Sequence, residues 1–64
     1  MGKARKGGYI FLWWRSDHAP RHVHEYRHGR LVVKWDLGSD RPMVGAVSKK
    51  ILRLIRELRQ EGRL

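Results

Sequence analysis

The chain has 64 residues, the size of one small domain, and its 15 lysine and arginine residues against 6 acidic ones give a net charge of +9. The lack of cysteine excludes a disulfide framework and a zinc–thiolate site as sources of stability. No apolar run approaches the roughly 20 residues of a membrane span, and no apolar signal segment opens the chain. These features predict a cytoplasmic protein that makes no membrane contact and attracts polyanions.

Three segments make up the N-terminal third of the chain. Residues 1–8 carry three cations and three glycines, a composition typical of a flexible basic arm, which leaves residues 9–64 as the single domain. Residues 9–14 are all apolar or aromatic and have the length of a strand, so they predict a buried central strand that is apolar on both faces. Residues 15–21 contain serine, aspartate and proline, which predict a loop.

The next part of the chain predicts a hairpin. Residues 22–27 and 31–37 have the composition of two strands. His28 and Gly29 lie between them and predict a two-residue turn, because glycine adopts a positive φ at little cost.

The turn also predicts which side chains share a face of the sheet. With Arg27 opposite Arg30, a regular register places His24 opposite Val33, and directly opposite residues lie on the same face. A one-residue shift in register would separate the two sets. The predicted common face comprises His22, His24 and Tyr26 together with Leu31, Val33, Trp35 and Leu37.

The C-terminal part predicts a loop and then a helix. Residues 38–45 read as a loop, with a short extended piece at Met43 and Val44. The helical pattern begins after Ser48, an N-cap residue, and ends before Gly62. Its apolar stripe comprises Ile51, Leu52, Ile55 and Leu58, with Leu54 at the edge. The fold class is therefore α+β: a small antiparallel sheet of three or four strands with one C-terminal amphipathic helix packed on one face.

A second stripe on the same helix is basic. Such a stripe either follows a phosphate backbone or is an ordinary solvated face. Together with the N-terminal arm, it predicts a polyanion-binding surface. The stripe comprises Lys49, Arg53, Arg56, Gln60 and Arg63, and the predicted polyanion-binding residues are Lys3, Arg5, Lys6, Lys49, Arg53 and Arg56.

Four histidines lie within residues 18–28, and three interpretations of them stay open. As metal ligands, His22 and His24 would share an ion with His18 and Asp17, but the spacing is weak evidence, and we predict no metal or other cofactor. As a general acid and base, His22 and His24 suit metal-independent RNA cleavage near neutral pH. As structural residues, they donate to backbone carbonyls and pack on neighbouring aromatic rings.

A motif runs through the first half of the chain. Gly8-Tyr9 and Phe11 are followed by Ser16-Asp17-His18-Ala19-Pro20 and then by His22-Val23-His24. With the strand and helix after it, this pattern resembles the small bacterial domain-of-unknown-function family 4160 over most of residues 8–60. Arg21 stands where the family usually has a second proline, and the stretch between strand and helix departs from the family pattern.

The resemblance implies a genetic context and does not imply a particular activity. Members of the family are often encoded beside another small domain of unknown function, and some are described as toxin–antitoxin-like. The matching positions imply a signature site, with no catalytic role attached to it. That site comprises Asp17, His18, His22 and His24.

Three functions follow from these features. The first is a toxin–antitoxin-like binding module, monomeric or homodimeric, that contacts nucleic acid or a small acidic cognate protein through its arm and helix. The second is a metal-independent ribonuclease that uses His22 and His24. The third is a structural or metal-stabilised module without catalysis.

Overall fold

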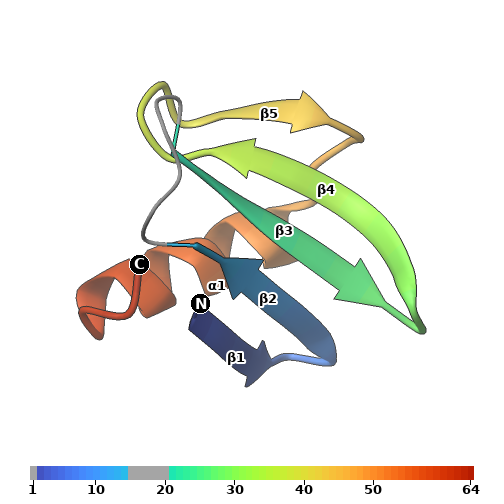
Figure 1. The fold of residues 1–64 in the computed structure, drawn as a ribbon, viewed down its shortest axis with the longest axis horizontal. Helices are drawn as coiled ribbons and strands as arrows, with labels where there is room; N and C mark the ends of the chain where they lie inside the picture. Colours follow the sequence, from blue (N-terminus) through green and yellow to red (C-terminus); the bar gives the residue numbers. More distant parts are fainter. Residues whose placement is uncertain (1, 15–20) are drawn as a thin grey trace.

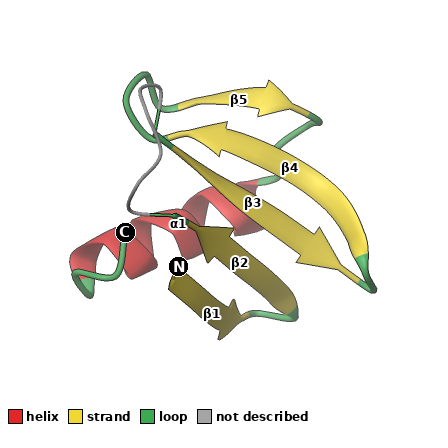
Figure 2. Cartoon of the chain, viewed as in Figure 1, coloured by secondary structure: helices red, strands yellow, loops and turns green. Residues whose placement is uncertain are grey.

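Five strands and one helix follow one another along the chain in a computed structural model that describes residues 2–14 and 21–64 (Figure 1). The strands form one antiparallel sheet in the order β1-β2-β3-β4-β5, and α1 crosses behind it (Figure 2). This arrangement confirms the predicted α+β fold, with one strand more than the upper estimate. The elements are β1 (Gly2–Lys6), β2 (Tyr9–Trp13), β3 (His22–Arg27), β4 (Arg30–Asp36), β5 (Arg41–Val44) and α1 (Lys49–Gln60).

The N-terminal segment belongs to the sheet, so the prediction of an arm outside the domain is wrong. β1 pairs with β2 along its whole length, and Ala4 is buried opposite Phe11. The turn between the strands is formed by Gly7 and Gly8, both at positive φ, which suits a tight hairpin. The cations of residues 2–6 are therefore held in fixed positions on an edge strand.

The β3–β4 turn forms as predicted. His28 and Gly29 both have positive φ, at 52° and 73°, and Arg27 pairs with Arg30. Positive φ at both central residues is the requirement of a type I′ turn, whose twist matches that of the flanking strands.

Beyond the turn, the register differs from the prediction because β4 contains a bulge. Tyr26 pairs with Leu31, but Glu25 pairs with Val33, so Val32 has no partner in β3. One extra residue in a strand moves all later residues to the other face relative to their predicted partners. The predicted common face is therefore wrong: His24 lies opposite Lys34, and the apolar residues of β4 beyond the bulge face the other way.

The hydrophobic core lies between the sheet and α1. Strand residues from β1 to β4 supply one wall, and four helix residues supply the other. We call this side of the sheet the inner face, and the side that α1 does not cover the outer face. The core residues are Ala4, Tyr9, Phe11, Trp13, Val23, Val33, Trp35, Leu37, Ile51, Leu54, Ile55 and Leu58.

The ends of α1 confirm both predicted caps. Ser48 Oγ accepts a hydrogen bond of 3.1 Å from the backbone N–H of Ile51, and Gly62 follows the helix at a φ of 72°. Within the apolar stripe, Leu54 is buried, whereas Leu52 is only half-buried at the margin. The region expected to be a loop before the helix contains β5, an exposed edge strand paired with β4. Among the described residues, no helix is long and apolar enough to cross a membrane.

Candidate functional site

The outer face of β3 carries three aromatic side chains at alternating positions. His22, His24 and Tyr26 point away from the core, while the residues between them point into it. Trp14, which follows β2, joins them. We call these four residues the aromatic row; all four are half-buried.

His24 is the centre of the aromatic row. Its ring meets Trp14 edge-on at a centroid distance of 5.2 Å and His22 edge-on at 4.9 Å. The ring of Tyr26 lies nearly parallel to that of His24, with centroids 6.4 Å apart and an interplanar angle of 25°. Edge-on and stacked contacts are the favourable geometries of aromatic pairs, so the row is a packed unit.

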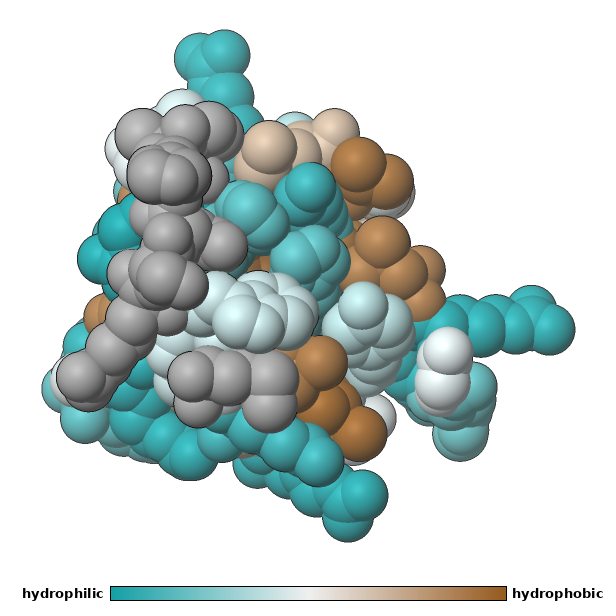
Figure 3. Space-filling model, viewed as in Figure 1, coloured by the Kyte–Doolittle hydropathy of each residue, from teal (hydrophilic) through white to brown (hydrophobic). Residues whose placement is uncertain are grey.

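Apolar side chains of β2 lie beside the aromatic row. Leu12 is opposite His24, and Ile10 is opposite Tyr26. Both are half-buried on the outer face, whereas Phe11 between them is fully buried in the core. In Figure 3, hydrophobic side chains lie among strongly hydrophilic ones on the face of the molecule that is turned away from α1.

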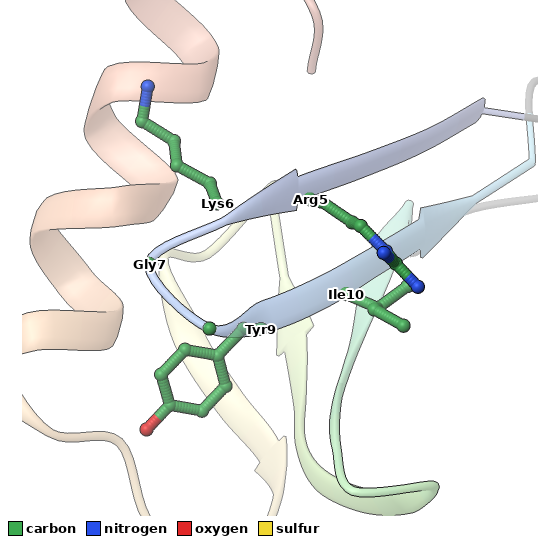
Figure 4. Close-up of a pocket in the computed structure, with 6 residues that line it drawn as sticks. Arg5, Lys6, Gly7, Tyr9 and Ile10 are labelled. Carbon is green, nitrogen blue, oxygen red and sulfur yellow. The ribbon is translucent and has the colours of Figure 1, made fainter.

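Cations flank this surface on both sides. Lys3 and Arg5 of β1 are opposite Leu12 and Ile10, and Lys34 of β4 is opposite His24. At the hollow beside the β1–β2 turn, two neighbouring cations of β1 point in different directions. Arg5 lies beside Ile10, while Lys6 extends toward α1 (Figure 4). Within the described ranges, none of the three outer-face cations has an ion-pair partner.

One carboxylate lies at the end of the row, and it is engaged by the backbone. Asp36 is opposite His22, and its Oδ1 accepts hydrogen bonds from the N–H groups of Gly38 at 2.8 Å and Ser39 at 3.3 Å. The hydrogen bond from Gly38 is the main reason that the pKa of Asp36 lies below its ordinary value, with the charge of His22 a smaller contribution. Asp36 therefore closes the turn after β4.

The acidic residues near α1 pair with two of the predicted polyanion-binding cations, Lys6 and Arg53. Lys6 Nζ lies 2.6 Å from Glu61 and 3.4 Å from Glu57, and the hydrogen bond to Glu61 raises the pKa of Lys6 above its ordinary value. Arg53 lies 4.0 Å from the same Glu57. Lys6 thus braces β1 against the helix instead of facing outward, and the positive charge of this side is partly neutralised.

Two further cations of the predicted helix surface remain exposed. Lys49 and Arg56 have no ion-pair partner in the part of the chain that the structure describes. They lie on the far side of the sheet from Lys3 and Arg5. The predicted polyanion-binding residues therefore divide into two separate surfaces, and the one on the outer face adjoins the aromatic row.

The structure brings two of the four signature residues together. His22 and His24 are in direct contact, and Asp17 and His18 lie outside the described residues. Among residues 2–14 and 21–64, no group of three or more side chains is placed to hold a metal ion. The two imidazole rings are therefore neighbours on one face of the sheet, and their use as a general acid and base stays a prediction.

Glu25 is a feature that the pattern of charges did not predict. It is 0% exposed, opposite Phe11 and Val33 on the inner face, and neither carboxyl oxygen has a hydrogen-bond partner among the described residues. Burial raises its pKa to about 8, so the neutral acid predominates at pH 7. The alternation of inward and outward side chains along β3 could have predicted this burial, since it puts Glu25 on the same face as Val23.

No protein-family model, curated protein or solved structure matches the chain. The resemblance to family 4160 therefore stays a prediction. The contacts and charges of the outer face are the basis for assigning a function.

Proposed function

We propose that the protein binds single-stranded nucleic acid on the outer face of its sheet. The observation that carries this proposal is the meeting of an aromatic row with three cations that have no ion-pair partner among the described residues. Proteins that bind single strands combine positive charge along the backbone with aromatic side chains on which bases stack. Sheets that display aromatic residues are one of the recurring forms of this interaction.

The spacing of the aromatic rings supports base stacking. Successive bases in a stacked strand lie about 3.4 Å apart. The centroids of His24 and Tyr26 are 6.4 Å apart in nearly parallel rings, which is close to two such steps. Bases of a single strand would therefore stack on the outward surfaces of these rings, and Trp14 offers a further ring beyond His24.

The positions of the cations support contact with a strand that crosses the sheet. Lys3 and Arg5 lie on β1 and Lys34 on β4, so they stand on either side of the row. Neighbouring strands lie about 4.8 Å apart, which places the two sets of cations roughly 14 Å from each other across the sheet. Phosphates on both sides of a stacked base would then each meet a positive charge.

A single strand fits this surface better than a duplex. In a duplex the base faces are occupied by neighbouring bases, and only their edges and the backbone are accessible. The aromatic row would then contribute nothing to binding, whereas a single strand offers its bases to stacking.

The proposal also includes the localisation of the protein and the partner encoded beside it. The resemblance to family 4160 supports a cytoplasmic, toxin–antitoxin-like module with a cognate protein encoded nearby. An acidic protein partner would use exposed cations of α1 such as Lys49 and Arg56. We favour nucleic acid on the outer face because the cations there flank the aromatic row, whereas the ring that Lys50 of α1 lies over, that of Tyr9, is buried.

Charge reversal on the two faces tests the proposal. Binding of a short fluorescent single-stranded RNA, and of the same RNA as a duplex, is measured by anisotropy at several salt concentrations. Lys3→Glu with Arg5→Glu should weaken single-strand binding at least tenfold and reduce the magnitude of the salt slope by about 1.4, since each phosphate contact contributes about 0.7.

A matched control has the same change in net charge on α1. Lys49→Glu with Arg56→Glu replaces two exposed cations on the other side of the molecule, and it should change single-strand affinity much less. Equal losses from the two double variants would mean that net charge alone drives binding. Tighter binding of the duplex than of the single strand would overturn the proposal.

A further inference from the structure

A basic hollow lies at one end of the sheet, where β1 begins, β2 ends and the chain leaves α1. It has a volume of about 610 Å³. Three cations line it, and each comes from a different segment: Lys3 from β1, Arg21 from the residue before β3 and Arg63 from the residues after α1. Its other lining residues are Gly2, Trp13, Gly62 and Leu64.

The backbone at each of these cations is anchored. The backbone N–H of Arg63 donates to Leu58 O at 2.9 Å, and the Arg63 guanidinium donates from Nη2 to Lys3 O at 3.3 Å. The carbonyl of Arg21 accepts a hydrogen bond of 2.9 Å from Leu37 N. The three positive groups are therefore carried by positions that the fold holds in place.

One wall of the hollow depends on the absence of a side chain. A Cβ at Gly2 would come within 1.9 Å of the Trp13 indole, so only glycine allows the ring to lie against the backbone of β1. Trp13 is 9% exposed and thus presents a narrow aromatic surface to the hollow. The site therefore joins an aromatic edge to the three cations that line the hollow.

The charge of the hollow is largely uncompensated. Within the described part of the chain, Lys3 and Arg21 have no ion pair, and the one contact of Arg63 with a carboxylate is long, at 3.9 Å to Glu61. Cations from several directions suit a compact dianion better than a single internal phosphodiester. A phosphate monoester carries about −1.5 to −2 at pH 7, and arginine binds such groups with two parallel hydrogen bonds.

We infer that this hollow binds the terminal phosphate monoester of the nucleic-acid strand whose bases lie on the outer face. The inference rests on the proposed function and deepens it. Lys3 connects the two sites, because its strand position lies beside Leu12 on the outer face and the same residue also lines the hollow. A strand that ends in the hollow would continue directly onto the outer face.

The test compares RNA oligonucleotides of one sequence with a 5′-phosphate, a 3′-phosphate or hydroxyl groups at both ends. One of the two phosphorylated forms should bind about tenfold more tightly than the hydroxyl form, as expected for one or two charge-assisted hydrogen bonds. Arg21→Gln with Arg63→Gln should abolish this difference and leave the affinity for the hydroxyl form nearly unchanged. Arg53→Gln with Arg56→Gln, which removes the same charge elsewhere, should preserve the difference.

The outcomes separate the two proposals. If all three oligonucleotides bind equally and binding still depends on Arg5 and Lys34, the hollow is not a terminal-phosphate site and the outer face remains a binding surface. If none binds, both proposals fail.

The Trp13 indole N–H resonance gives a separate readout when the protein is titrated with inorganic phosphate. The resonance should shift in the wild type and stay fixed in Arg21→Gln with Arg63→Gln. No shift in the wild type would overturn the inference.

Discussion

The two faces of β3 show how one strand serves two purposes. Val23 and Glu25 point inward and are fully buried, while His22, His24 and Tyr26 point outward and are half-buried. The inner face is closed by α1, so it must be filled and electrically neutral. The outer face is not covered by α1, and it combines aromatic rings with cations. The difference shows that stability and the proposed binding depend on different residues of the same element.

The largest expected effect is the difference in protein stability between a substitution on the inner face and one on the outer face. Phe11→Ala removes a fully buried ring and should lower the free energy of unfolding by about 3–5 kcal/mol, which is comparable to the total stability of so small a domain. Trp14→Ala on the outer face removes a half-buried ring, so it should cost about half as much and leave a folded protein. Urea unfolding followed by circular dichroism checks both. A Phe11→Ala variant at least as stable as Trp14→Ala would mean that the core does not lie where the structure places it.

The second prediction concerns the carboxyl group on the inner face. Glu25 has a pKa raised from 4.5 to about 8 by burial, so the folded state keeps a proton that the unfolded state loses above pH 4.5. Stability should therefore be greatest below pH 4.5, fall between pH 4.5 and 8 by at most about 1.4 kcal/mol per pH unit, and then level off as far as this group is concerned.

The matched variant for this prediction is Glu25→Gln, which keeps the shape of the side chain and cannot ionise. The wild type should lose urea resistance between pH 5 and 8, and the variant should lose much less, so that the gap between their midpoints widens with pH. Parallel pH profiles for the two proteins would show that Glu25 is not the buried acid that the structure indicates.

The smallest expected effect lies at the hairpin that joins β3 to β4. His28 has a φ of 52°, a conformation that asparagine adopts more readily than histidine. His28→Asn should therefore stabilise the protein slightly, by no more than about 0.5 kcal/mol, and leave RNA binding unchanged. A loss of RNA affinity in this variant would extend the binding surface to the turn and blur the distinction between the two faces.

Local signals in the sequence were sufficient for the helix and the central hairpin. Ser48 and Gly62 mark the ends of α1 because a side-chain cap and a positive φ are local requirements. His28 and Gly29 mark the turn for the same reason. The α+β class then follows from one amphipathic helix and a series of short strands.

The register and the edge strands were not predictable in the same way. Residues 31–33 are all apolar, so the pattern gives no sign of which one forms the bulge, and Val32 takes that position only because Val33 and Trp35 then fill the core. In β1 a single small residue, Ala4, is buried among cations, which leaves no alternation to recognise.

The candidate site was predictable in its residue types but not in its arrangement. Charge alone pointed to Lys3 and Arg5, which lie on the outer face, and equally to Lys6, which turns to the helix and pairs with Glu61. The bulge in β4 decides which residue lies opposite His24, and it places Lys34 there instead of the expected Val33. Such effects of tertiary packing have no signature in a short window of sequence.

The measurement that most directly tests the central claim is the mapping of NMR chemical shifts on isotopically labelled protein during titration with single-stranded RNA. The account predicts perturbations at the Trp14 indole and at the side chains of His24, Tyr26 and Lys34, with little change along the exposed face of α1. Perturbations confined to Lys49, Arg53 and Arg56, with the aromatic row unaffected, would contradict it and place binding on the helix.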